Sequence, residues 1–253
     1  MGCLDVSKFN KKATDNNQLM LNMMKRGKSA DQCKCIDYLY APAEAPKKGC
    51  FASIQKKAGC LGNKAWDMDD YINHVDAVVN QLNLRERAIA KIGLDETQIS
   101  EIPPVLLNSF IYRGDDIKIK SEETNIEGIW RNVSNKYSVT WIFFSATQIY
   151  TYTYVLDTTS DNAVEYTKDF FYTDITCIRT EHEVEEKIIE RKKLGCGCFK
   201  KNKESQFYHA NKEYDTLSIT VPNDSYSFCC LTNDTIEQSI QAAKAMIREK
   251  KNG

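Results

Sequence analysis

Hydrophobic residues recur at the spacing of an α-helix in residues 66–104. Five of them follow one another at intervals of four, three, four and three, which predicts one apolar helix face. They are Met68, Ile72, Val75, Val79 and Leu82. A second helical run, LRERAIAKIG, ends at Gly93, a residue type that favours the end of a helix. We therefore predict a helical region over 66–104.

From residue 105 onward the hydrophobic period changes to two. Segments of β-branched and aromatic residues, separated by turn residues, predict about seven antiparallel strands. They include VLLNSFIY, IEGIWRNV, KYSVTWIFFS, QIYTYTYVLD, AVEYTKDFFY and DITCIRT. The end of the chain returns to helical spacing, with Ile236, Ile240, Ala243 and Ile247 on one face. This order predicts an α+β fold: an antiparallel β-barrel or orthogonal sandwich closed by a C-terminal α-helix and preceded by the helical region.

Residues 1–65 are polar and lysine-rich, and we predict them to be irregular. In DNNQLMLNMMKRG the apolar residues Leu19, Met20, Met23 and Met24 predict only about a turn and a half of helix. The following CKCIDYLYAPAEAPKKGCFASIQKKAGCLG is interrupted by prolines and glycines, which predicts loops. We therefore expect a cysteine-containing N-terminal segment without regular structure.

Two local patterns within residues 105–253 call for an interpretation. IYTYTYVL places Tyr150, Tyr152 and Tyr154 on one face of a strand, and we expect a half-exposed sheet face rather than an aromatic binding platform. The charged stretch EHEVEEKIIERKKLGCGCFKKNKE interrupts the strand pattern. We interpret residues 181–213 as an insertion that forms either two long strands or a charged helix and a loop.

The tail DTLSITVPNDSYSFCCLTNDTIEQSIQAAKAMIREKK resembles the end of a pleckstrin-homology-like or GRAM-like domain, where the last strands precede a helix packed across the barrel mouth. TQIYTYTYVLD followed by YTKDFFYTDITCIRT is also similar to the middle of such domains, especially of the bacterial type. The resemblance covers residues 105–253 and rests on the order of elements rather than on an invariant motif.

Two departures from that family bear on the ligand. The phosphoinositide-binding version carries a lysine and paired arginines across its first strands, whereas the matching hairpin here offers Arg131 and Lys136. The tryptophan common in the C-terminal helix of eukaryotic members is absent, and residues 242–246 take its place. The resemblance therefore implies a non-enzymatic interaction module that binds a protein partner or associates with its own copy.

Composition and charge exclude several classes of partner. The chain of 253 residues is 42% hydrophobic, has a formal net charge of −1 and a pI of about 6.3, so it can form a core but has no global basic field to hold nucleic acid. No apolar stretch approaches the roughly 18 residues of a membrane span, and the N-terminus lacks the apolar run of a secretory signal. We expect a cytoplasmic protein with at most weak membrane contact.

No catalytic motif is recognisable. The histidines His74, His182 and His209 have no neighbouring serine, cysteine or carboxylate arrangement typical of a triad. Phosphate-binding loops, dinucleotide fingerprints and calcium loops are also missing from the sequence. We expect no enzyme activity and no cofactor.

Zinc is the alternative that the cysteines suggest. Four thiolates can close a structural tetrahedral site, and Cys33, Cys35, Cys50 and Cys60 lie in a segment with few other means of folding. Their spacing departs from the usual knuckle, in which two residues separate the paired cysteines. A cytosolic thiol or structural-zinc protein is therefore the second interpretation.

Two further cysteine sites bear on a third interpretation, a peripheral membrane protein. Cys196 and Cys198 lie between glycines and lysines, where they could form half a metal clip, a redox pair, a palmitoylation site or an ordinary hairpin tip, and we favour the tip. The MGC start presents Gly2 and Cys3 for acylation, although Val6 stands where the usual motif has Ser or Thr.

Overall fold

The computed structural model describes residues 6–40, 65–95, 102–123, 130–192, 205–230 and 234–252. Within them the chain is α+β with antiparallel sheets and a C-terminal helix. The helices are α1 (Val6–Lys25), α2 (Ala30–Tyr40), α4 (Met68–Gln81), α5 (Leu84–Ile92) and α6 (Asp234–Asn252). The strands are β1 (Val105–Phe110), β2 (Ile119–Glu123), β3 (Trp130–Ser134), β4 (Lys136–Phe144), β5 (Gln148–Asp157), β6 (Ala163–Phe171), β7 (Cys177–Lys192), β8 (Ser205–Val221) and β9 (Asp224–Cys230).

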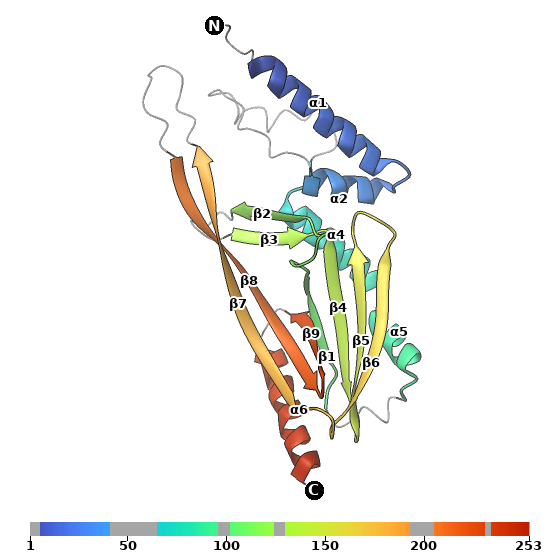
Figure 1. The fold of residues 1–253 in the computed structure, drawn as a ribbon. Helices are drawn as coiled ribbons and strands as arrows, with labels where there is room; N and C mark the ends of the chain where they lie inside the picture. Colours follow the sequence, from blue (N-terminus) through green and yellow to red (C-terminus); the bar gives the residue numbers. More distant parts are fainter. Residues whose placement is uncertain are drawn as a thin grey trace.

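The strands form two larger sheets and one hairpin (Figure 1). The four-stranded sheet has the spatial order β1-β4-β5-β6, the three-stranded sheet has the order β7-β8-β9, and β2 pairs with β3. β1 lies beside β9, so one edge of the four-stranded sheet approaches the three-stranded sheet. Within the described residues no strand pairs with the outer edge of β6, and the sheets do not close into a barrel.

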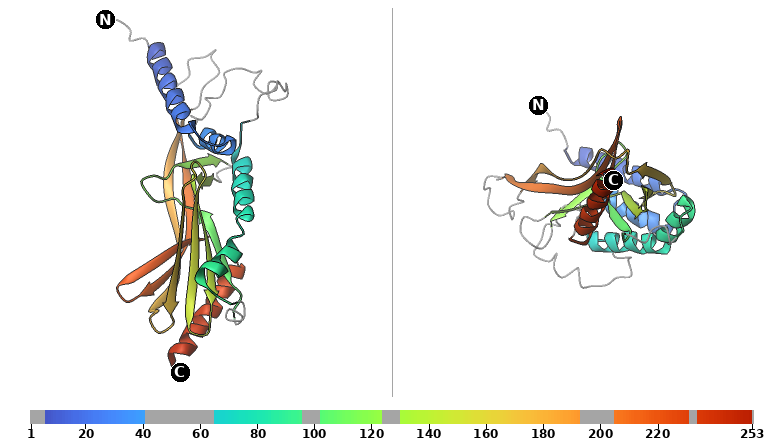
Figure 2. Two further views of the ribbon diagram at one scale, coloured as in Figure 1. Left: turned by 90° about the vertical axis from the view of Figure 1, so that its right-hand side faces the viewer. Right: turned by 90° about the horizontal axis from the view of Figure 1, so that it is seen from below.

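Helices α4 and α5 cover one face of the four-stranded sheet, and α2 lies at the end of the sheet that carries the β5–β6 turn (Figure 1). Figure 2 shows α4 and α5 on one side of this sheet and the β7–β8 hairpin on the other. The core between these helices and the sheet is the first core of the molecule, and Tyr71 of α4 lies within it. The Tyr71 ring stacks on that of Tyr38 of α2 at 5.0 Å between centroids and lies 6.0 Å from Phe110 of β1. Its hydroxyl donates a hydrogen bond of 2.7 Å to the Ser134 carbonyl, which satisfies the polar atom inside this aromatic layer.

The opposite face of the four-stranded sheet packs against the three-stranded sheet and α6. This second core is mostly aliphatic and takes residues from both sheets and from the C-terminal helix. Ile240 and Ala243 of α6 are buried, as their helical spacing predicts. The buried set comprises Ile102, Val105, Leu107, Ile142, Phe144, Ile149, Phe170, Tyr172, Ile175, Leu217, Ile219, Phe228, Ile240, Ala243 and Ile247.

Local sequence signals account for the limits of α4 and α5. Asp67 accepts a hydrogen bond from the Asp70 backbone and Asp70 accepts one from the Asp67 backbone, so a capping box begins α4. Gly93 adopts a left-handed φ of 75° at the end of α5, a conformation that costs glycine little. The predicted helical region is confirmed over these two helices.

The tyrosine row of β5 is more buried than the sequence predicts. Tyr152 and Tyr154 face the helical layer, where their side chains are 0% and 7% exposed. The Arg87 guanidinium of α5 lies 5.5 Å from the centroid of the Tyr154 ring. The expectation of a half-exposed face was wrong for these two rings, because α5 packs over the strand.

The N-terminal prediction of an irregular segment was wrong for residues 6–40. Two helices occupy this range, and α1 has 20 residues rather than a turn and a half. α2 packs Cys35, Tyr38 and Leu39 into the first core, and this packing stabilises a helix where the sequence pattern predicted a loop. In the 181–213 region the structure shows the two-strand alternative, since β7 and β8 pair from Cys177↔Thr220 to Lys192↔Ser205.

Candidate functional site

The outer edge of β6 is unpaired within the described residues, and it adjoins a pocket. In an antiparallel pair, the residues whose backbone groups bond the neighbouring strand alternate with residues whose groups point away. At the two ends of the β5–β6 pairing, the Tyr172 N–H donates to the Thr147 carbonyl at 3.1 Å and the Asp157 N–H donates to the Asn162 carbonyl at 3.3 Å. The even-numbered residues of β6 therefore bond β5.

The odd-numbered residues of β6 direct their backbone groups outward. By the same alternation, Glu165, Thr167 and Asp169 turn their N–H and C=O groups away from β5. The outward carbonyl of Phe171 already accepts a hydrogen bond from the Asp174 N–H at 3.0 Å. A strand edge of this kind is a template for another extended chain, and proteins normally blunt it with charge, proline or a covering element. Here the edge is nine residues long and contains no proline.

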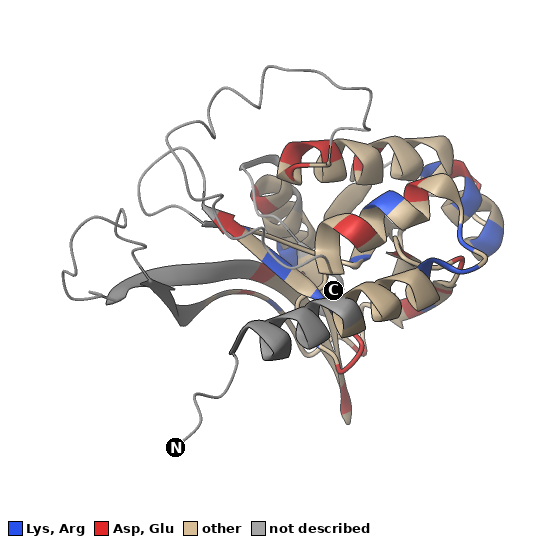
Figure 3. Cartoon of the chain, turned by 90° about the horizontal axis from the view of Figure 1, so that it is seen from above, with Lys and Arg blue, Asp and Glu red and all other residues tan. Residues whose placement is uncertain are grey.

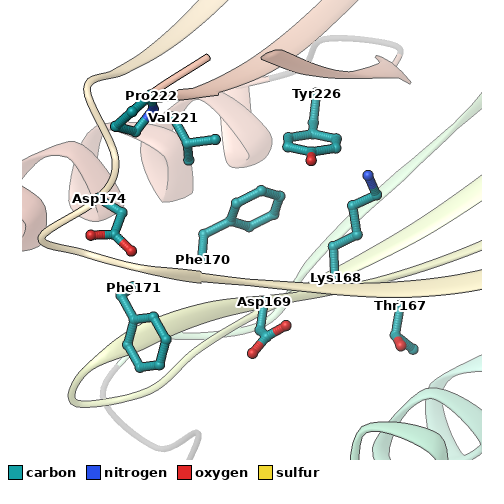
Figure 4. A pocket seen from close by; sticks show the side chains of 9 residues that line it. All are labelled: Thr167, Lys168, Asp169, Phe170, Phe171, Asp174, Val221, Pro222 and Tyr226. Carbon is teal, nitrogen blue, oxygen red and sulfur yellow. The ribbon is translucent and has the colours of Figure 1, made fainter. Parts of the chain in front are cut away.

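A groove of about 540 Å³ lies beside the lower half of this edge (Figure 4). Its lining combines residues of β6, of the turn after β6 and of the β8–β9 turn. Figure 4 shows Lys168 and Phe170 pointing toward Tyr226, while Asp169 and Phe171 point to the other side of the strand. The lining residues are Thr167, Lys168, Asp169, Phe170, Phe171, Asp174, Val221, Pro222 and Tyr226.

Aromatic contacts hold the wall of this groove in place. Phe170 is 5% exposed, and its ring centroid lies 5.2 Å from that of Tyr226. The Lys168 ammonium lies 3.4 Å from the Tyr226 centroid, a cation–π geometry. The Tyr226 hydroxyl beside Asp224 lowers the pKa of that carboxyl, and the same contact raises the pKa of Tyr226. The wall is therefore formed before any ligand arrives.

Large apolar side chains are exposed along the same strand. Val164 is 57% exposed, Tyr166 is 38% exposed and Phe171 is 52% exposed. Two exposed carboxylates, Asp169 and Asp174, lie near Phe171 at the groove. Apolar surface, outward backbone groups and carboxylates thus lie on one strand and its following turn, an arrangement suited to an extended peptide.

Glu165 fastens β6 to the helical layer. Its carboxylate accepts a hydrogen bond of 2.5 Å from Lys91 and a second one from Arg87, both of α5. The Lys91 contact, followed by that of Arg87, lowers the pKa of Glu165 below its usual range. The upper part of the edge strand is therefore held rigidly, which reduces the entropy lost when a partner strand binds.

The described cysteines of the zinc hypothesis do not face a common centre. Cys33 and Cys35 lie two residues apart on α2, so the helix turns them in nearly opposite directions. Burial, chiefly, raises the pKa of the Cys35 thiol to about 12, which disfavours the thiolate that a metal requires. The Cys33 thiol donates to the Lys25 carbonyl at 3.8 Å.

The other candidate residues lie outside the described residues. These are Cys50, Cys60, Cys196, Cys198, Gly2 and Cys3, so the zinc, hairpin-tip and acylation hypotheses stay predictions. In the part of the chain that the structure describes, no group of three or more His, Cys, Asp or Glu side chains is arranged to hold a metal ion. Of the three histidines, His74 packs against Trp66 with ring centroids 5.0 Å apart and ring planes tilted by 46°, and His182 contacts the Asp215 carboxylate at 2.7 Å.

The sequence contains one signal that β6 is an edge strand, and the sequence analysis above did not use it. Lys168 and Asp169 stand in the middle of an otherwise strand-like segment, and charged residues are typical of edge strands. Which strand lies at the edge depends on the spatial order, and the hydrophobic period of AVEYTKDFF does not contain that order.

Comparisons with protein-family models, curated proteins and solved structures found no match for this chain. A search of the described helices found none long and apolar enough to cross a membrane. The case for a function therefore depends on the geometry of the edge strand and its groove.

Proposed function

We propose that the chain is a non-enzymatic interaction module that binds an extended segment of a protein partner along β6. The observation that carries the proposal is the nine-residue edge strand with outward backbone groups and an adjoining groove of about 540 Å³. Added strands gain affinity from main-chain hydrogen bonds and specificity from pockets for alternate side chains. Both requirements are present at β6.

The order of elements supports a pleckstrin-homology-like architecture as part of this proposal. A four-stranded antiparallel sheet is followed by a three-stranded one and by a C-terminal helix, and both sheets and the helix contribute to the second core. We propose that the two sheets form an orthogonal sandwich, as the sheets of that family do. The resemblance of residues 105–253 to this family agrees with that topology.

The side chains around the groove indicate which segments of a partner protein would bind there. A strand that pairs with β6 turns alternate side chains toward Phe170 and Tyr226, where an apolar residue would replace water on an aromatic wall. Its other side chains approach the exposed Asp169, which favours a basic residue. We expect a segment in which apolar residues alternate with residues that include Lys or Arg.

A second copy of this chain fits the edge less well. When two β6 strands pair antiparallel over their whole length, Thr167 lies opposite its own counterpart and Glu165 lies opposite Asp169 of the other copy. Directly opposed like charges destabilise a strand pair. A different protein is therefore the preferred occupant, and dimerisation is an outcome that the experiments below would detect.

Hydrogen exchange measured by NMR tests the edge without a known partner. The amide hydrogens of Thr167 and Asp169 should exchange rapidly, whereas those of Lys168 and Phe170, which bond β5, should exchange more slowly by about a hundredfold or more. Equal protection at all four amides would show that something already covers the edge, and the proposal would then fail.

Peptide selection tests the function itself. A displayed random peptide library is panned on the protein, and the dissociation constants of selected peptides are measured for the wild type and for two variants. Thr167→Pro removes an outward N–H and should weaken binding by about tenfold or more, whereas Thr167→Val keeps that N–H and should bind normally.

Melting curves show whether the variants fold, and they compare the effects of proline at positions 167 and 168. Because the Thr167 N–H is not used within the sheet, Thr167→Pro should melt near the wild type, while Lys168→Pro removes a bond to β5 and should melt much earlier. Selected peptides that bind Thr167→Pro as tightly as the wild type would overturn the proposal. A wild-type dimer that Thr167→Pro dissociates would assign the edge to self-association instead.

A further inference from the structure

Few of the described side chains of the N-terminal helix α1 are buried against the body. Figures 1 and 2 show it projecting at the end of the molecule opposite the C-terminus. Of its described side chains, Leu21 is buried at 4% exposure, and the Lys25 ammonium pairs with Asp37 of α2. The chain then reverses through Gly27, which adopts a left-handed φ of 75°. Among the described side chains of α1, those of residues 16–25, the contacts with the body lie near the C-terminal end of the helix.

An apolar stripe on α1 faces solvent. Leu19 is 61% exposed, Met20 is 48% exposed and Met23 is 70% exposed. Positions 19, 20 and 23 lie within about 100° of one another around a helix, so they form one continuous stripe. Three large apolar side chains at such exposure on one short stretch are typical of an interaction surface rather than of an ordinary solvated helix.

The same segment is strongly basic within a chain that is nearly neutral. Residues 6–28 contain six basic side chains and a single acidic one, Asp15. The six are Lys8, Lys11, Lys12, Lys25, Arg26 and Lys28. Since the whole chain has a net charge of −1, the remainder is acidic, and the charge is divided between α1 and the body. Figure 3 shows basic residues gathered at the turn that joins α1 to α2.

We infer that α1 docks on an anionic lipid surface. A helix that combines a basic segment, an exposed apolar stripe and low overall hydrophobicity lies in the interface of a bilayer, with its apolar side chains among the headgroups and acyl chains. Attraction between Lys or Arg and anionic lipid contributes to the binding. The acidic body would be repelled by the same surface, so the charge division orients the molecule with α1 toward the lipid.

A groove in a partner protein fits this helix less well. Helix-in-groove recognition uses anchors that continue over several turns at positions i, i+3, i+4 and i+7. The described stripe covers about a turn and a half, and the polar residues Asn16, Asn17 and Gln18 precede it. A lipid interface tolerates an interrupted stripe because it does not require a fixed register. This site is independent of the peptide-binding edge of β6.

Vesicle sedimentation with the full chain, expressed without acyl modification, tests the inference. The protein should bind vesicles of phosphatidylcholine mixed with phosphatidylserine, should bind pure phosphatidylcholine at least about tenfold more weakly, and should be released as salt screens the charges. Binding that is equal on both vesicles, or that salt leaves unchanged, would overturn the inference, as would no vesicle binding at all.

Matched triple variants locate the contact. Leu19→Ser with Met20→Ser and Met23→Ser should lower vesicle binding by about tenfold or more, because the inserted apolar area is lost. The control changes the three exposed large apolar residues of β6, with Val164→Ser, Tyr166→Ser and Phe171→Ser, and should bind vesicles like the wild type. An unchanged affinity of the α1 variant, or an equal loss in the β6 variant, would contradict a docking role for α1.

Two further variants separate charge from acylation. Lys8→Gln, Lys11→Gln and Lys12→Gln together should weaken binding by about a hundredfold, at roughly fivefold for each charge near the surface. In a separate preparation from a host that can acylate the chain, Gly2→Ala with Cys3→Ser removes both acylation candidates and should leave vesicle binding intact. If the second variant alone abolished binding, the contact would belong to an acyl chain and not to α1.

Discussion

The helices at the two ends of the chain are close in length, 20 residues for α1 and 19 for α6, and both have an apolar side. α6 buries Ile240, Ala243 and Ile247 against both sheets. α1 buries Leu21 and leaves Met20 and Met23 in solvent. An amphipathic pattern therefore predicts that a helix forms, but it does not predict whether the apolar side meets the protein itself or another surface.

Connectivity explains much of the difference between the two helices. α6 begins at Asp234, soon after β9 ends at Cys230, so a short connection holds it near the second core. α1 is joined to α2, and α2 packs its own apolar residues into the first core. α4 and α5 already cover that face of the sheet and α2 covers its end, and of the described side chains of α1 only Leu21 is buried.

The largest expected effect on stability comes from a substitution in α6, the terminal helix that packs on both sheets. Ile240→Asp places an unpaired charge inside the second core and should lower the free energy of unfolding by several kcal/mol, about 3–5. Urea denaturation followed by circular dichroism measures the change. The control Ala242→Asp lies on the exposed side of α6 and should cost no more than about 0.7 kcal/mol, the range of helix propensities. A stable Ile240→Asp protein would contradict the packing of α6.

A smaller effect should distinguish the two sides of α1. Leu21→Ala removes its buried anchor and should free α1 from the body, with a local loss of hydrogen-exchange protection in α1 and a change of about 1–2 kcal/mol. Met23→Ala changes an exposed side chain and should stay within about 0.5 kcal/mol. Exchange rates measured by mass spectrometry compare the two, and equal effects would show that α1 does not dock through Leu21.

The smallest effect concerns the contact between α5 and the edge strand. Because Lys91 and Arg87 lower the pKa of Glu165, its contribution to stability is present above the unfolded pKa of about 4.3 and is lost as the pH falls toward the lower folded value. Glu165→Gln should therefore destabilise by about 0.5–1 kcal/mol at neutral pH and by almost nothing at about pH 3.

Urea titrations of both proteins across this pH range measure that difference. Glu249→Gln, which removes an exposed carboxylate of α6, is the matched control. A destabilisation by Glu165→Gln that persists unchanged at low pH would assign the effect to packing rather than to charge.

Sequence patterns predicted where helices and strands form better than they predicted what these helices and strands pack against. The helical spacing from Met68 predicted α4, Gly93 predicted the end of α5, and Ile240 was correctly placed in the core. Residues 33–40 were predicted as part of a loop because prolines and glycines interrupt the stretch that begins with them. Packing under Tyr71 makes them part of a helix, since tertiary contacts override a weak local preference.

The candidate edge was beyond sequence reasoning for a related reason. AVEYTKDFF predicts a strand wherever it lies in a sheet, and the charged pair Lys168 and Asp169 is only a hint of an edge. The groove requires Tyr226 of β9 to meet Phe170 of β6, and a sequence separation of more than fifty residues conceals that contact. The cysteine spacings raised metal and thiol hypotheses, because ligand spacing can be read without knowing the fold.

By itself the sequence determined the class of the fold, the change from helical to strand period at residue 105, the apolar side of α6 and the basic character of the N-terminal segment. These properties are local, since each depends on residues a few positions apart. Only the tertiary structure decided which strand is an edge, that Tyr152 and Tyr154 are covered, and that the apolar stripe of α1 stays in solvent. Those properties depend on which surfaces far apart in the chain meet, because burial and strand pairing are set by long-range contacts that no short pattern specifies.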